Sequence, residues 1–342
     1  MSATIAELLE KYDPERHRRR VEIAVGSKTF ELNDFCFMFD PVWSTPANKL
    51  PNKISSLLLD SYYQLPDRPD LAFACLWMAF NSTFAQTAVR DSYAKNKENL
   101  TDTFGLECAA EVIVGTPNIA IAVDGSTRSL MDLLIIAIQA IPEKLTSMIA
   151  TNAVRAVAFQ LQLNSRRYES KAFTGLRSNF PALGQLIERC HGEAYSDGVV
   201  ATIGAANAEG ILTPINPEKS QAIIRSLSAC FLNLFRTGSV TMTHHASTQT
   251  VTLSFTERDR ISLFLRYVLY ASRNNLAHGK VSSRLNSDTA NPQSYKVNLY
   301  IYVSLYICLG ILLVDLGFAS NVIVGQAIQN LKIILPKPIA TY

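Results

Sequence analysis

The chain is organised around one stretch, Ser272-Arg273-Asn274-Asn275-Leu276-Ala277-His278-Gly279, which ends a long apolar segment that begins near Thr256. Thr256 stands three residues before Asp259, a spacing typical of the capping box that opens a helix. Gly279 is the residue type that most readily ends a helix in the left-handed conformation. Apolar side chains recur between these two ends at helical intervals, at Ile261, Phe264, Leu265, Val268 and Leu269. The pattern predicts a helix of roughly five turns with Arg273, Asn274 and His278 on its final turns.

Arg273 and His278 do not stack on one face of a regular helix. At about 100° per residue they lie roughly 140° apart around the axis. The reach of the arginine side chain, a frayed last turn or a partner subunit would bring both to one substrate. An arginine and a histidine near a helix C-terminus are also favoured by the helix dipole and can simply bond the last carbonyl groups. The residues alone leave a capping role and a functional role open.

The arrangement of an arginine, a polar residue, three further residues and a histidine at the end of an apolar helix resembles the R-N-x-x-x-H signature of the HEPN superfamily (higher eukaryotes and prokaryotes nucleotide-binding). A second stretch is similar to the first bundle helix of the ApeA-like HEPN proteins, in which an aromatic-rich run ends in Phe-Asn. That stretch is Leu76-Trp77-Met78-Ala79-Phe80-Asn81-Ser82-Thr83-Phe84. The resemblance covers about residues 55–95 and 255–320.

The resemblance implies a helical bundle that dimerises, so that two copies of the motif face one another across a cleft. Active members are metal-independent endoribonucleases that leave 2′,3′-cyclic phosphate and 5′-hydroxyl ends. It implies that His278 moves protons at the ribose 2′-hydroxyl or the leaving 5′-oxygen. Arg273 would bind the phosphate through two parallel hydrogen bonds, and Asn274 would orient the phosphate or His278. No metal and no cofactor are expected.

The same resemblance suggests a cytoplasmic toxin or antiviral-defence effector that acts on RNA and is restrained by an antitoxin or a regulatory partner. Two other functions stay open. A non-catalytic HEPN module would use the same groove to bind nucleotide, RNA or a partner protein. A helical protein could instead be anchored to a membrane through residues 297–314, an uncharged run that contains three tyrosines and ends at Asp315. We expect that run to be a buried bundle helix, because no basic cluster follows it directly.

Basic residues outside the motif supply tentative RNA contacts. The net charge of +3 is too small to indicate a nucleic-acid binder, so local clusters must provide any affinity. Lys280 and Arg284 lie in a polar loop after the motif, where they could hold phosphates beside His278. Arg166 and Arg167 belong to a second basic cluster between residues 163 and 178.

Cysteine and histidine spacing argues against a metal site. The six cysteines are scattered without CxxC spacing, which is typical of reduced thiols in a cytosolic protein. His244 and His245 are adjacent in a predicted hairpin, where neighbouring side chains point to opposite sides of a strand. We therefore expect no disulfide, no structural zinc and no metal ligand pair.

The sequence predicts a mainly α fold: a HEPN-type helical bundle with a helical insertion and one or two small β-hairpins. The expected parts are an N-terminal extension with a hairpin (1–53), the first half of the bundle (54–115), a helical insertion or second lobe (116–250) and the second half of the bundle with the motif (251–342). Hairpins are predicted at 21–32 and 240–255. The small-residue segment 198–210 is predicted to be a loop. Trp77, Phe80 and Phe84 recur at helical spacing and are predicted to pack in the core.

Overall fold

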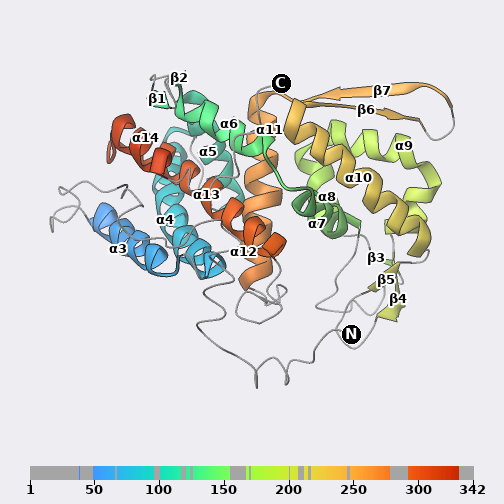
Figure 1. Cartoon of the computed structure of the whole chain (residues 1–342). Helices are drawn as coiled ribbons and strands as arrows, with labels where there is room; N and C mark the ends of the chain where they lie inside the picture. Colours follow the sequence, from blue (N-terminus) through green and yellow to red (C-terminus); the bar gives the residue numbers. More distant parts are fainter. Residues whose placement is uncertain are drawn as a thin grey trace. The chain divides into compact units, whose positions relative to one another are not determined.

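Helices dominate the described structure, a computed structural model that covers residues 38, 49–65, 68–95, 101–116, 121–123, 126–154, 167–168, 171–199, 201–206, 212–214, 217–244, 247–277 and 292–330. The mainly α class is confirmed (Figure 1). The chain divides into two compact units. The first comprises Met1–Ala140 and Ile261–Tyr342, and the second comprises Ile141–Arg260. The predicted hairpin at 21–32 lies outside the described residues.

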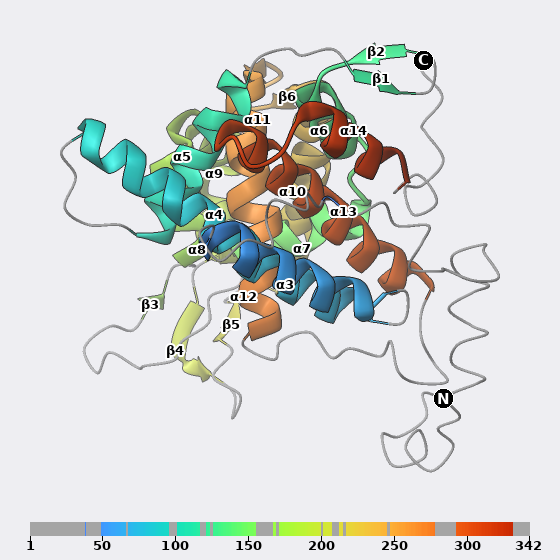
Figure 2. The same cartoon turned by 90° about the vertical axis from the view of Figure 1, so that its left-hand side faces the viewer.

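The described part of the first unit is a helical bundle with a short hairpin beside it (Figure 2). Its long central helix α13 packs along α4, which also contacts α3 and α5, and α13 contacts α6 and α14 as well. Antiparallel strands β1 and β2 form the hairpin, with Ala122 opposite Thr127. The elements are α3 (Lys49–Tyr63), α4 (Pro69–Lys95), α5 (Asp102–Gly115), β1 (Ile121–Val123), β2 (Ser126–Arg128), α6 (Leu130–Gln139), η3 (Leu265–Leu269), α12 (Tyr270–Ala277), α13 (Pro292–Asp315) and α14 (Asn321–Asn330). Helix α11 (Glu257–Phe264) crosses the boundary between the units.

The predicted aromatic stripe of α4 lies in the core of this unit. Trp77, Phe80 and Phe84 are all buried. The ring centres of Trp77 and Phe80 lie 5.5 Å apart, and those of Phe80 and Phe84 lie 5.3 Å apart. The prediction of a packing role is confirmed, because aromatic rings at these separations contribute both buried area and favourable edge contacts.

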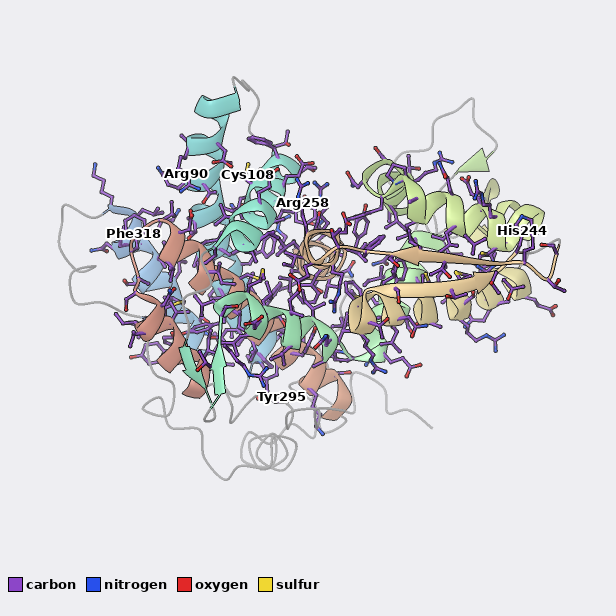
Figure 3. The ribbon with its side chains drawn as sticks, turned by 90° about the horizontal axis from the view of Figure 1, so that it is seen from above. Arg90, Cys108, His244, Arg258, Tyr295 and Phe318 are labelled. Atoms are coloured by element: carbon purple, nitrogen blue, oxygen red, sulfur yellow. The ribbon has the colours of Figure 1, made fainter. Side chains whose placement is uncertain are left out.

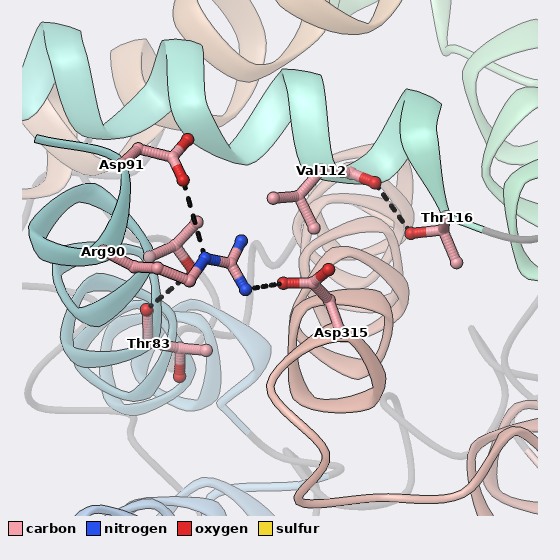
Figure 4. A network of polar contacts seen from close by, with 7 residues as sticks. Thr83, Arg90, Asp91, Val112, Thr116 and Asp315 are labelled. Carbon is pink, nitrogen blue, oxygen red and sulfur yellow. Dashed lines mark hydrogen bonds and ion pairs between the residues drawn. The ribbon is translucent and has the colours of Figure 1, made fainter. Parts of the chain in front are cut away.

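Helix α13 is the one described helix long and apolar enough to cross a membrane, yet 83% of its apolar window is buried inside the protein. Its tyrosine hydroxyls have partners within the bundle. Tyr306 contacts the hydroxyl of Tyr62 at 2.8 Å, and Tyr300 donates to the Ala137 carbonyl at 2.8 Å. At its end Asp315 accepts from Arg90 of α4 at 2.7 Å (Figure 4). These contacts support the predicted core helix, since buried hydroxyls need hydrogen-bond partners.

Gly105 sets the close approach of α5 to α4. A Cβ atom added there would lie 2.5 Å and 2.6 Å from two ring carbons of Phe84. Gly105→Ala is therefore expected to lower the free energy of unfolding by about 1–3 kcal/mol, because a packed core resists an extra methyl group. Chemical denaturation checks this. Gly115→Ala is the control on the same helix, where an added Cβ meets nothing within 4 Å; equal losses in both variants would contradict the packing argument.

The second unit packs helix α10 against α7 and α9, and its described residues form two small sheets. Its elements are α7 (Glu143–Val154), β3 (Arg167–Tyr168), α8 (Lys171–Asn179), α9 (Pro181–Val199), β4 (Ala201–Ala206), β5 (Leu212–Pro214), α10 (Pro217–Thr237), β6 (Ser239–Thr243) and β7 (Thr250–Ser254). The three-stranded sheet has the antiparallel order β3-β4-β5. The hairpin predicted at 240–255 is confirmed as β6 and β7, with Val240 opposite Leu253.

The structure differs from the prediction in one loop and in two limits of the predicted parts. The segment 198–210 contains the end of α9 and strand β4, because Ala201 pairs with Pro214 and Ala206 with Leu212 through the backbone, whatever the side chains. Residues 116–140 group with the first unit, where Tyr300 binds the carboxyl end of α6. The second unit extends beyond residue 250, because the buried Arg260 donates to the Phe235 carbonyl of α10.

Candidate functional site

The motif lies at the end of a continuous helical run from Glu257 to Ala277. Its predicted capping box is present. The Asp259 amide donates to the Thr256 hydroxyl at 3.1 Å, and the Thr256 amide donates to the Asp259 carboxylate at 3.1 Å. Thr256 thus satisfies one of the amides that have no partner inside a helix and fixes where the run starts.

One turn of this run is a π-helix, η3, which the sequence did not predict. The Tyr270 amide donates to the Leu265 carbonyl, five residues back instead of four. Such a turn places one extra residue in the helix, so side chains beyond it are rotated by about 100° from their positions on a regular α-helix. Arg273 and Asn274 lie on α12, four and five residues beyond the end of the turn, and therefore take their direction from it.

Contacts with α4 and α5 hold the helix within the π turn and directly after it. Arg266 Nη2 lies 2.6 Å from Glu107 Oε1, and the Tyr270 hydroxyl donates to Asp102 Oδ2 at 3.3 Å. The Tyr270 ring lies 6.0 Å from that of Trp77. Later residues of the motif helix thus meet earlier residues of α5, so the two helices run antiparallel. The last turns of the motif helix are positioned by both neighbours.

Arg273 and Asn274 meet each other at the surface of the bundle. Arg273 Nη1 donates to Asn274 Oδ1 at 2.9 Å, and both residues are half-buried. Among the described residues no carboxylate pairs with Arg273, whereas Arg266 and Arg90 each have an acidic partner. An amide accepts a hydrogen bond without neutralising charge. The Arg273 guanidinium therefore keeps a positive charge that a bound anion could use.

Of the other predicted site residues, the structure describes Arg167 alone. His278, Lys280, Arg284 and Arg166 lie outside the described residues. Arg167 belongs to β3 of the second unit, where it pairs with Thr202 through the backbone. The described site therefore consists of Arg273 and Asn274, with Tyr270 and Glu107 as positioning contacts. The last two were missed by sequence reasoning, and no local pattern marks them.

The described residues contain no cluster of metal ligands, and a buried thiol among them is unreactive. Among those residues no group of three or more histidine, cysteine or acidic side chains could hold a metal ion. His244 lies at the turn end of the β6–β7 hairpin (Figure 3). Five described cysteines carry free thiols. Burial raises the pKa of Cys230 to about 12, so this thiol stays protonated and is a poor nucleophile at neutral pH.

His191 of α9 gives the second unit a predicted pH dependence. Its Nε2 atom is buried and has no partner among the described residues, and burial lowers the pKa of His191 from 6.5. Below about pH 6.5 the unfolded chain takes up a proton that the folded chain resists, so the free energy of unfolding should fall with pH there and stay level above. His191→Gln is expected to flatten this dependence in denaturation curves between about pH 7 and pH 5.

The control for that experiment is His244→Gln, since His244 lies at the end of a hairpin rather than between helices. It should retain the parent's pH dependence. An unchanged pH profile in the His191 variant would show that another group causes the acid sensitivity.

Comparisons with family models, with curated proteins and with solved structures returned no match for this chain.

Proposed function

We propose that the chain is a metal-independent endoribonuclease of the HEPN type. The observation that carries the proposal is the Arg273–Asn274 pair, a half-buried guanidinium held by an amide at 2.9 Å near the end of a bundle helix. A guanidinium presents its donors as a fixed fork that matches two phosphate oxygens. Holding that fork in place before substrate binds reduces the reorganisation needed when charge develops on the phosphate.

The π turn adds weight to this proposal. Such turns occur frequently at functional sites, because they redirect side chains at the cost of regular hydrogen bonding. Here the Arg266–Glu107 ion pair holds a residue of the turn itself, and the Tyr270–Asp102 contact follows the turn at once. We take this as a device that fixes the direction of Arg273.

In the proposed reaction His278 accepts the proton of a ribose 2′-hydroxyl, and the 2′-oxygen attacks the adjacent phosphorus. The bond from phosphorus to the 5′-oxygen breaks, and that oxygen takes up a proton from the protonated His278 or from water as it leaves. Arg273 stabilises the charge on the non-bridging oxygens, and Asn274 orients Arg273. The products are a 2′,3′-cyclic phosphate and a 5′-hydroxyl. Lys280 and Arg284, and at a greater distance in sequence Arg166 and Arg167, would contact flanking phosphates.

The proposed setting is the cytoplasm, where a homodimer acts as a toxin or antiviral-defence effector under the control of an antitoxin or regulatory partner. Homodimerisation would supply each site with groups from both copies. This would resolve the angular separation of Arg273 and His278 on one helix.

The test is to incubate the purified full chain with total RNA in excess chelator, beside His278→Ala and the matched control His244→Ala. We expect the parent and the His244 variant to leave cyclic phosphate ends and the His278 variant to leave RNA intact. Equal cleavage by all three proteins would remove His278 from the mechanism. RNA binding without cleavage by the parent would favour the alternative, a non-catalytic module that uses the same residues.

A further inference from the structure

In the β6–β7 hairpin of the second unit, two backbone hydrogen bonds show which residues bond across the hairpin and which point outward. The Phe255 amide donates to the Gly238 carbonyl at 2.7 Å, and the His244 amide donates to the Gln249 carbonyl at 2.8 Å. In an antiparallel ladder hydrogen-bonded pairs alternate with pairs whose backbone groups point outward. Counting from these two bonds, the β7 residues whose N–H and C=O groups point away from β6 are Thr250, Thr252 and Ser254.

The two edges of this hairpin are not equivalent. On β6 the outward-facing groups of Ser239 are already bonded, because the Thr237 hydroxyl donates to the Ser239 carbonyl at 3.0 Å and accepts from its amide at 3.3 Å. No such bond closes the β7 edge in the described part of the chain, and β6 and β7 form a two-stranded sheet there. The edge of β7 is therefore the longer open one.

The chemistry of β7 leaves that edge unprotected. Residues 239–255 contain no aspartate, glutamate, lysine or arginine. Exposed sheet edges are commonly protected by charged side chains or prolines, which discourage pairing with another strand. Here Thr250 and Thr252 are exposed on one face, and Val251 and Leu253 are half-buried on the other. An uncharged edge with β-branched residues is suited to accept a further strand.

We propose that β7 pairs antiparallel with β7 of a second copy of this chain, with Thr252 at the two-fold axis, to form a four-stranded sheet. Thr250 would then lie opposite Ser254 of the second copy, and Val251 opposite Leu253. Each outward-facing residue exchanges backbone bonds with the residue across the axis. The pairing is independent of the proposed ribonuclease activity.

A second copy fits this edge because β7 has the same pattern in both directions. Its residues alternate hydroxyl, apolar, hydroxyl, apolar, hydroxyl about Thr252. An isologous contact places each residue type against its own kind, which is favourable only when like charges are absent. Within one chain the same face already shows this contact, because the Thr241 and Thr252 hydroxyls lie 2.9 Å apart.

The register can be tested by cysteine cross-linking of the full chain. In Thr252→Cys the two Cα atoms should lie about 5.5 Å apart across the axis, within the range of a disulfide. Mild oxidation is expected to give a covalent dimer of doubled mass. Thr241→Cys is the matched control, with the same residue type on the same exposed face, but it would be three strand spacings, roughly 14 Å, from its copy. The parent controls for the native cysteines.

Variants that block the β7–β7 pairing provide a second test. The Thr252 amide takes no part in the β6 ladder, so Thr252→Pro removes an outward donor and leaves the hairpin bonds in place. Thr252→Lys places two like charges at the axis. Because a five-residue edge is small beside a standard interface, it should add a weak, concentration-dependent association step in sedimentation to any dimer that forms through the bundle. Both variants should lose that step, whereas Thr241→Lys should retain it.

Cross-linking at neither position, or equally at both, would overturn the proposal. So would association of Thr252→Lys that matches the parent, because the contact would then use another surface. None of these readouts involves RNA, so a failure here and a failure of the ribonuclease proposal are separate results.

Discussion

Replacing Arg273 with alanine is expected to lower the rate of RNA cleavage by about a hundred- to a thousandfold, the usual effect of removing one charge-stabilising donor from an active site. The guanidinium is held by Asn274 and has no carboxylate partner among the described residues, so it is available to a phosphate. Initial cleavage rates at saturating RNA, with folding checked by denaturation, measure the effect. Because Arg273 is half-buried, stability should change little compared with activity.

Two further variants separate the charge of Arg273 from its shape. Arg273→Lys retains the positive charge but loses the planar fork, and should recover only part of the lost rate. Asn274→Asp retains the size of the side chain and places a carboxylate beside the guanidinium, which should neutralise it and slow cleavage while strengthening the local contact. Arg236→Ala, at an exposed position of α10, is the control. Full activity in Arg273→Ala would assign this residue to capping.

A helix start or a hairpin could be predicted from the sequence wherever residues close together in the chain determine it. The capping box at Thr256 and Asp259 and the period-two pattern around Val240 and Leu253 depend on residues close together in the chain, and both are present in the structure. Helix α5 was not predicted. Its packing depends on Gly105 meeting Phe84 of another helix, a contact that no local periodicity carries.

The π turn was also beyond the reach of sequence patterns. Leu265, Val268 and Leu269 fit α-helical spacing, and all three are buried in the turn. In the π turn the amide donates to the carbonyl five residues back instead of four. This change redirects the side chains beyond the turn, but it does not alter the order of apolar residues in the sequence. The sequence therefore identified Arg273 and Asn274 as neighbours but could not supply the direction in which they point.

The division into units was predicted only in outline, because it is decided by distant contacts. Helix α6 was placed in the insertion, whereas the Tyr300 hydroxyl ties its last residues to α13 across 163 positions of sequence. The same holds for the support of the site. Glu107 and Asp102 lie far from the motif in sequence and meet it only when α5 packs antiparallel to the motif helix.

Trp77→Ala is expected to lower the free energy of unfolding of the first unit by about 3–5 kcal/mol, the usual cost of removing a large aromatic side chain from a core. Trp77 is 5% exposed. Its ring lies 5.5 Å from that of Phe80 and 6.3 Å from that of Phe84. The cavity cannot collapse easily, because both neighbours belong to the same rigid helix. Denaturant titration measures the loss, and Tyr63→Ala, at a residue 67% exposed on α3, should cost far less.

The same variant links the core to the candidate site, because the Trp77 ring also packs on Tyr270 at 6.0 Å. This ring and an exposed bond to Asp102 at 3.3 Å hold the Tyr270 side chain. Loss of the ring should let α12 open more often, so amide exchange there should accelerate more than in α3. Trp77→Phe, which retains an aromatic ring, should restore most of the protection. Faster exchange in every helix equally would indicate global destabilisation alone, and would show that Trp77 does not hold Arg273 in place through Tyr270.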